Sequence, residues 1–297
     1  MIADAFTSIG ARRNGRAPGW EATHGRGGGG PGRTPGGRPR TTCGQAARTG
    51  TEPRPLVHER SAVEDTPEHA ERAVAETRLV HEMHRRATSL LVEAAHRAAT
   101  PSPALGQLRD FLVAQLRHHH AAEDAWLWPG IIEAAPELRH RLDVLSAQHC
   151  GLDVALDRLA AAPLPSPASA SESGEGTATG PGPGADAASE GWSDELRNAA
   201  ADVRDSVHEH LDHEEPVLFP ALRDHVSAEE WEAFAARVVD TTPTAGGHLM
   251  IGFLHEIGSP DEVELFTSAL PPEVAPMLPV MRDHGAAALA ELRGASR

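Results

Sequence analysis

The chain has 297 residues, a formal net charge of −16 at pH 7 and no tyrosine. The missing tyrosine excludes a tyrosyl metal ligand or radical, and two cysteines are too few for a disulfide framework or a four-thiolate metal site. No apolar run approaches the roughly 20 residues that a membrane-spanning helix needs, and no apolar signal segment follows the N-terminus. A cytoplasmic protein without a membrane segment is therefore expected.

Residues 1–65 differ in composition from the rest of the chain, because they are rich in glycine, proline and arginine. Such a segment buries too little apolar surface to offset its chain entropy, so we expect a disordered tail. An Arg/Gly arm can bind nucleic acid, and this is one interpretation of the tail. The scarcity of aromatic residues in it and the acidity of the remaining chain favour the other interpretation, a tail without a binding role. Nucleic acid is therefore not expected as a partner.

Beyond the tail, helical periodicity dominates and an all-α fold is expected. Thr66-Pro67 is a helix-start signal, and Pro129 is expected to end or bend a later helix. The segment 163–191 is rich in proline, serine and glycine and is expected to form a flexible loop. Apolar stripes at 3–4 residue spacing predict four amphipathic helices that pack as a bundle over residues 66–222. Their expected ranges are 66–99, 104–133, 136–162 and 193–222.

Residues 223–297 also have a helical pattern and are expected to pack on the bundle as an extension. Ser227 and Glu230 have the spacing of a capping box at the start of one of these helices. Several scattered histidines lie here, and we expect structural or exposed roles for them. They are His225, His248, His255 and His284.

A repeated pattern links two of the expected bundle helices. The segments His119–Pro129 and His210–Pro220 both read His-x-x-x-Glu, then an acid, then four residues, then Pro. Residues i and i+4 share one face of a helix, so each segment directs one imidazole and one carboxylate the same way. The first histidine of each segment lies on the apolar stripe of its helix, and His149 interrupts a series of leucines in a third helix. Histidine and glutamate in such places are costly to bury unless they are paired or bound to metal.

This composition predicts the type of metal site. Nitrogen and carboxylate ligands without thiolate suit iron, manganese or zinc. Two carboxylates on facing helices can bridge two metal ions, and the histidines then complete the coordination. A centre in which histidine outnumbers carboxylate favours reversible ligand binding over substrate oxidation.

The histidine-containing segments resemble hemerythrin-like proteins of the HHE cation-binding type. They are Val80–Arg86, His118–Pro129, Gln148-His149 and His210–Pro220. The region from Trp231 onward resembles the C-terminal extension of bacterial members, so the resemblance covers about residues 66–290. It implies an up-and-down four-helix bundle with a non-haem di-iron centre, with manganese or zinc as alternatives, that binds or senses dioxygen or a related ligand such as nitric oxide. It also implies a ligand set: His81, His119, Glu123, His149, His210 and Glu214.

Some assignments around this ligand set stay open. The apolar stripe of the first helix places His84 nearer the buried face, whereas the family motif favours His81. The position one turn after His149, a further histidine in the founding oxygen carriers, is Asp153, which weakens the expectation of an oxygen carrier. A di-iron enzyme that reduces peroxide or nitric oxide is the alternative function, and it rests on the family resemblance alone.

Several neighbours of the ligand set are expected to have supporting roles. Asp124 and Glu215 are expected to accept hydrogen bonds beside the ligands. Cys150 is rotated about 100° from its neighbour on a helix, so it is not expected to bind metal. Supporting or exposed roles are also expected for the remaining histidines of the motifs, His118, His120 and His213.

Overall fold

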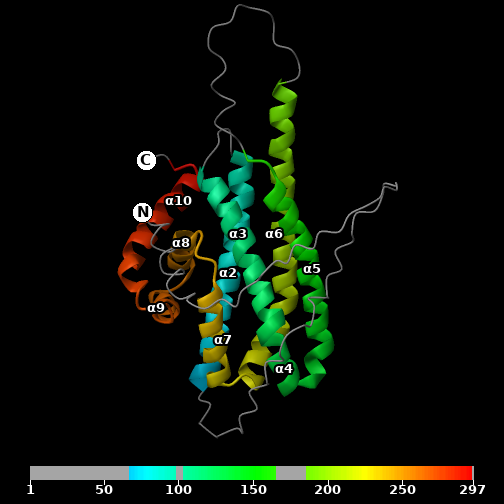
Figure 1. The fold of residues 1–297 in the computed structure, drawn as a ribbon, viewed down its shortest axis with the longest axis vertical. Coiled ribbons are helices and arrows are strands. Elements are labelled where there is room, and N and C mark those ends of the chain that lie inside the picture. The colour runs from blue at the N-terminus through cyan, green and yellow to red at the C-terminus, as the bar shows by residue number, and fades with distance from the viewer. Residues whose placement is uncertain (1–66, 98–102, 165–184, 296–297) are drawn as a thin grey trace, which may run out of the picture. The chain divides into compact units, whose positions relative to one another are not determined.

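The computed structural model describes residues 67–97, 103–164 and 185–295, and every regular element among them is helical (Figure 1). The all-α fold expected from the periodicity is thereby confirmed. Residues 1–65, the expected N-cap Thr66 and most of the segment 163–191 lie outside the described residues, so the expectations for them stay predictions. Within the described part of the chain, none of the helices combines the length and the apolar character that crossing a membrane requires.

Four long helices form a closed ring of contacts. They are α2 (Pro67–Arg97), α3 (Pro103–Ala122), α5 (Arg139–Ala161) and α6 (Ala185–His225). Helix α2 packs against α3 and α6, and α5 packs against the same two helices, so the four enclose a common interior. This arrangement is the four-helix bundle that the apolar stripes predict.

Two apolar clusters fill this interior, and polar side chains lie between them. On α5, Leu145 belongs to one cluster and Leu152 to the other, with the buried His149 between them. On α6, Leu211 and Val217 flank the polar position in the same way. Apolar packing above and below therefore surrounds one polar layer in the middle of the bundle.

The helix that follows α3 is irregular where Pro129 was expected to end or bend it. Residues Glu123–Leu127 form a π-helical turn, and α4 (Trp128–Ala134) continues from it with Pro129 in its first turn. Proline has no N–H to donate, and the first turn of a helix tolerates this. The Trp128 N–H donates to the Glu123 carbonyl five residues back, whereas an α-helix would use the carbonyl four residues back. The helix is therefore wider at Glu123, an expected ligand.

Two further boundaries differ from the expected ones. Helix α6 begins at Ala185, before the expected start near Ser193, because the alanine-rich sequence there has high helix propensity. The same helix continues through Pro216 and Pro220 to His225. A short 3₁₀ turn, Pro136–Leu138, precedes α5.

The C-terminal part forms α7 (Ala228–Thr241), α8 (Gly247–Ile257), α9 (Pro260–Ser268), the 3₁₀ turn Ala275–Met277 and α10 (Leu278–Leu292). Ser227 caps α7 in the expected capping box with Glu230, and Ser259 caps α9 in the same way. Helices α7, α8 and α9 contact α2, and α10 contacts α3. Phe253 and Leu289 belong to the same apolar cluster as the bundle core, so this part shares its hydrophobic core with the bundle.

Candidate metal centre

The polar layer contains the side chains that the motifs indicated, together with two more histidines. Helix α2 contributes His81 and His84, α3 contributes His119 and His120, the π turn after α3 contributes Glu123, and α5 and α6 contribute the rest. All of these side chains are buried except that of His119, which is 16 % exposed. The complete set is His81, His84, His119, His120, Glu123, His149, His210 and Glu214.

Seven of these side chains fall into two groups whose candidate ligand atoms all lie within 4.8 Å of one another. One group is His81, His119, Glu123 and Glu214, and the other is His120, His149 and His210. Each of the six residues of the expected ligand set therefore belongs to one or the other of the two groups. Helix α2 contributes His81 to a group, whereas His84 is buried beside the first group, with its ring centroid 4.9 Å from that of His119.

Each glutamate lies between a histidine of the first group and a histidine of the second. Glu123 Oε1 is 3.2 Å from His119 Nε2, and its Oε2 is 3.5 Å from His149 Nε2. Glu214 Oε2 is 3.1 Å from His210 Nε2, and its Oε1 is 3.9 Å from His81 Nε2. Both carboxylates thus face the two groups with one oxygen each.

Hydrogen bonds outside the layer orient three of the histidines. Glu215 Oε1 lies 3.2 Å from His81 Nδ1 and also accepts from Arg85 at 2.6 Å. Asp124 Oδ2 lies 3.0 Å from His149 Nδ1. The expectation that Asp124 and Glu215 accept hydrogen bonds beside the ligands is confirmed. Such bonds fix which ring nitrogen carries the proton and direct the other one inward.

The third oriented histidine is held by an amide. His210 Nδ1 is 2.9 Å from Gln148 Oε1, and the amide nitrogen of Gln148 donates to His213 at 3.0 Å. His213 is exposed and supports this amide, which agrees with its expected supporting role. His118 is half-buried and bonds to Thr241 Oγ1, outside both groups. Cys150 is also outside both groups.

The placement of His120 differs from the expected one. It is buried within the second group, with its ring stacked on that of His149 at a centroid distance of 4.4 Å. Consecutive helical residues point about 100° apart, so His119 and His120 were not expected on the same interior face. Because α3 contacts α2 on one side and α5 on the other, both directions lead into the interior. The adjacent pair His119-His120 was the sequence signal for two inward-facing histidines, but it can be interpreted only when the helices next to α3 are known.

The pKa shifts of the two glutamates show that the layer does not stabilise both carboxyls in their charged forms. Burial and the neighbouring Glu214 raise the pKa of Glu123 well above its ordinary value. Burial would also raise the pKa of Glu214, but the adjacent His81 and His210 lower it to about 2. Two carboxyls this close cannot both be ionised cheaply without a neighbouring cation.

Burial likewise acts on the histidines. It lowers the pKa of His84 to about 3, with a further contribution from His81, and it lowers the pKa of both His119 and His120. These rings are therefore neutral at pH 7, which is the state in which imidazole binds metal.

Residues 73–222 match the model of the Hemerythrin HHE cation binding domain, and this range is half of the chain. The chain belongs to this family. No curated protein and no solved structure gives a significant match. The family is named for cation binding, and the described core holds a buried cluster of histidine and glutamate with metal-ligand composition.

The side chains present fit a bound metal, as their unpaired atoms show. Both Glu214 oxygens, Glu123 Oε2, His81 Nε2 and His119 Nε2 are buried without a hydrogen-bond partner. Unpaired buried polar atoms are rare, and each costs roughly 1–3 kcal/mol. These five atoms belong to residues of the first group, and two of them, Glu123 Oε2 and Glu214 Oε2, also face histidines of the second group, so bound cations would satisfy them.

The second group shows the same need. Asp124 and Gln148 accept from the Nδ1–H of His149 and His210, which leaves both Nε2 atoms with lone pairs. These two Nε2 atoms are 3.2 Å apart. Two acceptors at this distance need a proton or a metal ion, so this group is also suited to a cation.

Proposed function

We propose that the chain binds two iron ions in this centre and uses them to bind or sense dioxygen or a related small ligand such as nitric oxide. The observation that carries the proposal is the position of Glu123 and Glu214, each between histidines of the two groups. His81 and His119 would hold one ion, His149 and His210 the other, and both glutamates would serve both ions. Manganese or zinc fits the same donor types.

The surroundings support ligand binding at such a centre. The metal ions, when bound, would supply open coordination positions for a small molecule. The apolar clusters on both sides keep bulk water away from the layer, and Glu215, Asp124 and Gln148 hold three histidines in fixed orientations. The larger share of neutral imidazole over carboxylate stabilises high-valent metal less well, which favours binding over substrate oxidation.

The test is metal analysis after anaerobic loading with ferrous iron and removal of excess metal. We expect about two iron ions per chain, and a visible absorption change on exposure to dioxygen or nitric oxide that reverses when the gas is removed. Glu214→Gln should lose most of the iron, because it removes one charge and one bridging oxygen. The matched control is His118→Ala, because His118 precedes His119 on α3 but lies outside both groups. This variant should keep both ions.

Two outcomes contradict the proposal. Fewer than one iron per chain in the loaded wild-type protein would show that the cluster is not a metal centre. Sustained consumption of peroxide or nitric oxide that His119→Ala abolishes would show an enzyme instead of a binding protein.

A further inference from the structure

His120 lies in the centre although it occupies an unspecified position of the His-x-x-x-Glu motif. Its side chain is 4 % exposed, and its Nδ1 is buried without a hydrogen-bond partner. Burying an imidazole in this way costs free energy unless another group satisfies it. The position therefore needs a partner that the described side chains do not supply.

The two adjacent histidines of α3 divide between the two groups. The ring of His119 faces α2, with centroid distances of 5.3 Å to His81 and 4.9 Å to His84. The ring of His120 faces α5 and α6, at 4.4 Å from His149 and 5.4 Å from His210. One helix thus serves both halves of the centre with consecutive residues.

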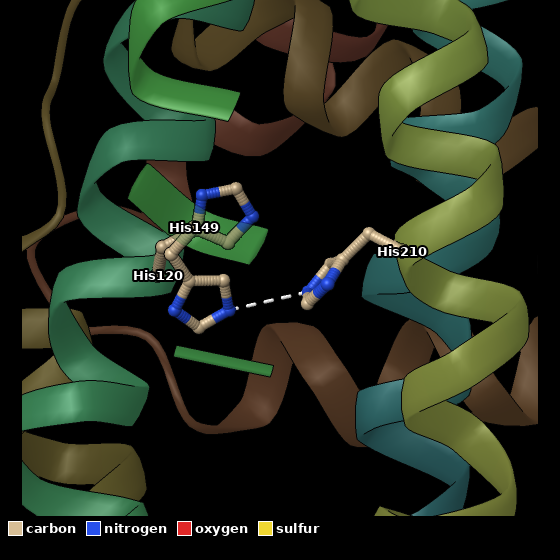
Figure 2. Close-up of side chains that lie close together, drawn as sticks. All are labelled: His120, His149 and His210. Carbon is tan, nitrogen blue, oxygen red and sulfur yellow. Dashed lines mark hydrogen bonds between the residues drawn. The ribbon is translucent and has the colours of Figure 1, made fainter. Parts of the chain in front are cut away.

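Three rings from three helices converge in the second group, as Figure 2 shows. His149 and His210 already direct their Nε2 atoms inward, because their Nδ1 atoms are engaged by Asp124 and Gln148. His120 brings a third imidazole to the same place, with its ring stacked on that of His149. Helix α5 supplies only one nitrogen here, because Asp153, one turn after His149, is exposed and outside the group.

We propose that His120 is a metal ligand and that it completes a position with three histidines beside a position with two, the two positions joined by Glu123 and Glu214. This inference rests on the proposed two-metal centre and specifies how its nitrogens are divided. The position with three histidines should hold its ion more tightly than the position formed by His81 and His119.

The test compares iron content and affinity in the full-length wild-type protein with those in His120→Phe and His120→Ala. Phenylalanine keeps a ring stacked on His149 but has no nitrogen, so His120→Phe should keep the fold and retain about one iron after desalting. We expect the affinity of the lost ion to fall by roughly 100-fold or more, since even the hydrogen-bond partners of ligands change affinity by roughly 10–100-fold. Added imidazole should restore the second iron in His120→Ala, because the truncated side chain leaves room for it. His118→Ala should bind as the wild type does.

The outcomes separate this proposal from the two-metal centre itself. A wild-type protein that binds no iron contradicts the proposed function. A wild-type protein that binds two ions while His120→Phe also binds two, with unchanged affinity, contradicts only the role of His120. If circular dichroism shows that neither variant folds, X-ray absorption of the loaded wild type decides, since the proposal requires five imidazoles for the two iron ions and is overturned if only four are found.

Discussion

At the scale of single residues, the buried side chains that suit a metal ion lower the stability of the metal-free protein. Glu123 and Glu214 face each other in a buried layer, and their pKa values shift in opposite directions. The apolar neighbours that exclude water also make each unpaired charge there more costly. Binding sites of this kind are where proteins retain local destabilisation.

Glu123→Gln should separate these two effects. A carboxyl whose folded pKa is raised above its unfolded value costs stability at pH 7, because the unfolded chain ionises it freely. Glutamine keeps the shape of the protonated carboxyl and can donate to Glu214, so the metal-free protein should gain at least about 1 kcal/mol of unfolding free energy at pH 7. The same variant should lose the proposed two-metal centre. Urea unfolding in the presence of a chelator, together with iron analysis, measures both effects.

The control for this variant is Glu133→Gln, an exposed acid on α4. Its unfolding free energy should stay within about 0.5 kcal/mol of the wild type. A metal-free Glu123→Gln protein that is less stable than the wild type would contradict the account of Glu123 as a strained buried acid.

At the scale of elements, a helix irregularity or a proline lies close to each carboxylate. The π turn Glu123–Leu127 begins at one expected ligand, and Pro216 follows closely after the other, Glu214. The absence of an N–H in Pro129 and Pro216 interrupts the regular α-helical ladder at both places. The π turn thus begins at Glu123, whereas α6 continues as an α-helix past Glu214, through Pro216 and Pro220.

The contact between α8 and α10 depends on glycine. A Cβ on Gly285 would overlap the His248 carbonyl oxygen and lie 2.8 Å from Gly252 Cα. Because backbone atoms cannot move aside as side chains do, Gly285→Ala should lower the free energy of unfolding by about 3 kcal/mol. Gly151 is also inside a helix, but a Cβ there meets nothing within 4 Å.

Gly151→Ala is therefore the matched control and should raise stability by roughly 0.5–1 kcal/mol through helix propensity. Urea midpoints of the two variants against the wild type give the comparison. If Gly285→Ala and Gly151→Ala shift the urea midpoint in the same direction, the close approach of α8 and α10 does not explain the effect of Gly285→Ala.

At the scale of the whole molecule, the C-terminal helices complete the bundle core. Trp231 Nε1 donates to the buried Glu76 of α2 at 2.7 Å, and Gln115 of α3 donates to the Pro243 carbonyl at 3.1 Å. Leu249, Phe253 and Leu289 are fully buried in the apolar cluster that also contains α2 and α3. The matched family range ends at residue 222, but the core of this chain continues beyond it.

A chain that ends at Val226 should therefore not fold as a stable monomer. Each fully buried leucine or phenylalanine contributes roughly 1.5–3 kcal/mol, and several of them would be lost together. We expect aggregation or a loss of cooperative unfolding, measured by size-exclusion chromatography and circular dichroism. The milder variant Trp231→Phe keeps a ring but removes the N–H, so it should fold and lose about 1–3 kcal/mol. A shortened chain that stays monomeric and unfolds at the wild-type urea midpoint would contradict this shared core.

Much of this architecture could be predicted from local sequence signals. The spacing of leucines in α3 and α5 predicted buried helix faces, and the capping box at Ser227 predicted the start of α7. The repeat of His119–Glu123 at His210–Glu214 predicted which helices meet at one polar layer. Such signals depend on helix periodicity and on the cost of buried polar groups, and both are local properties of the chain.

The sequence by itself determined the helical class, the polar residues of the core and the His-x-x-x-Glu pairs, because each follows from side chains at helical spacing. Only the tertiary structure decided where His84 and His120 lie. Their places depend on which helices border α2 and α3. The angle of about 100° between His119 and His120 shows that both side chains point into the interior only once α2 is known to lie on one side of α3 and α5 on the other. The structure also placed Glu123 and Glu214 between histidines of the two groups, because this placement is a relation among several helices that no single segment contains.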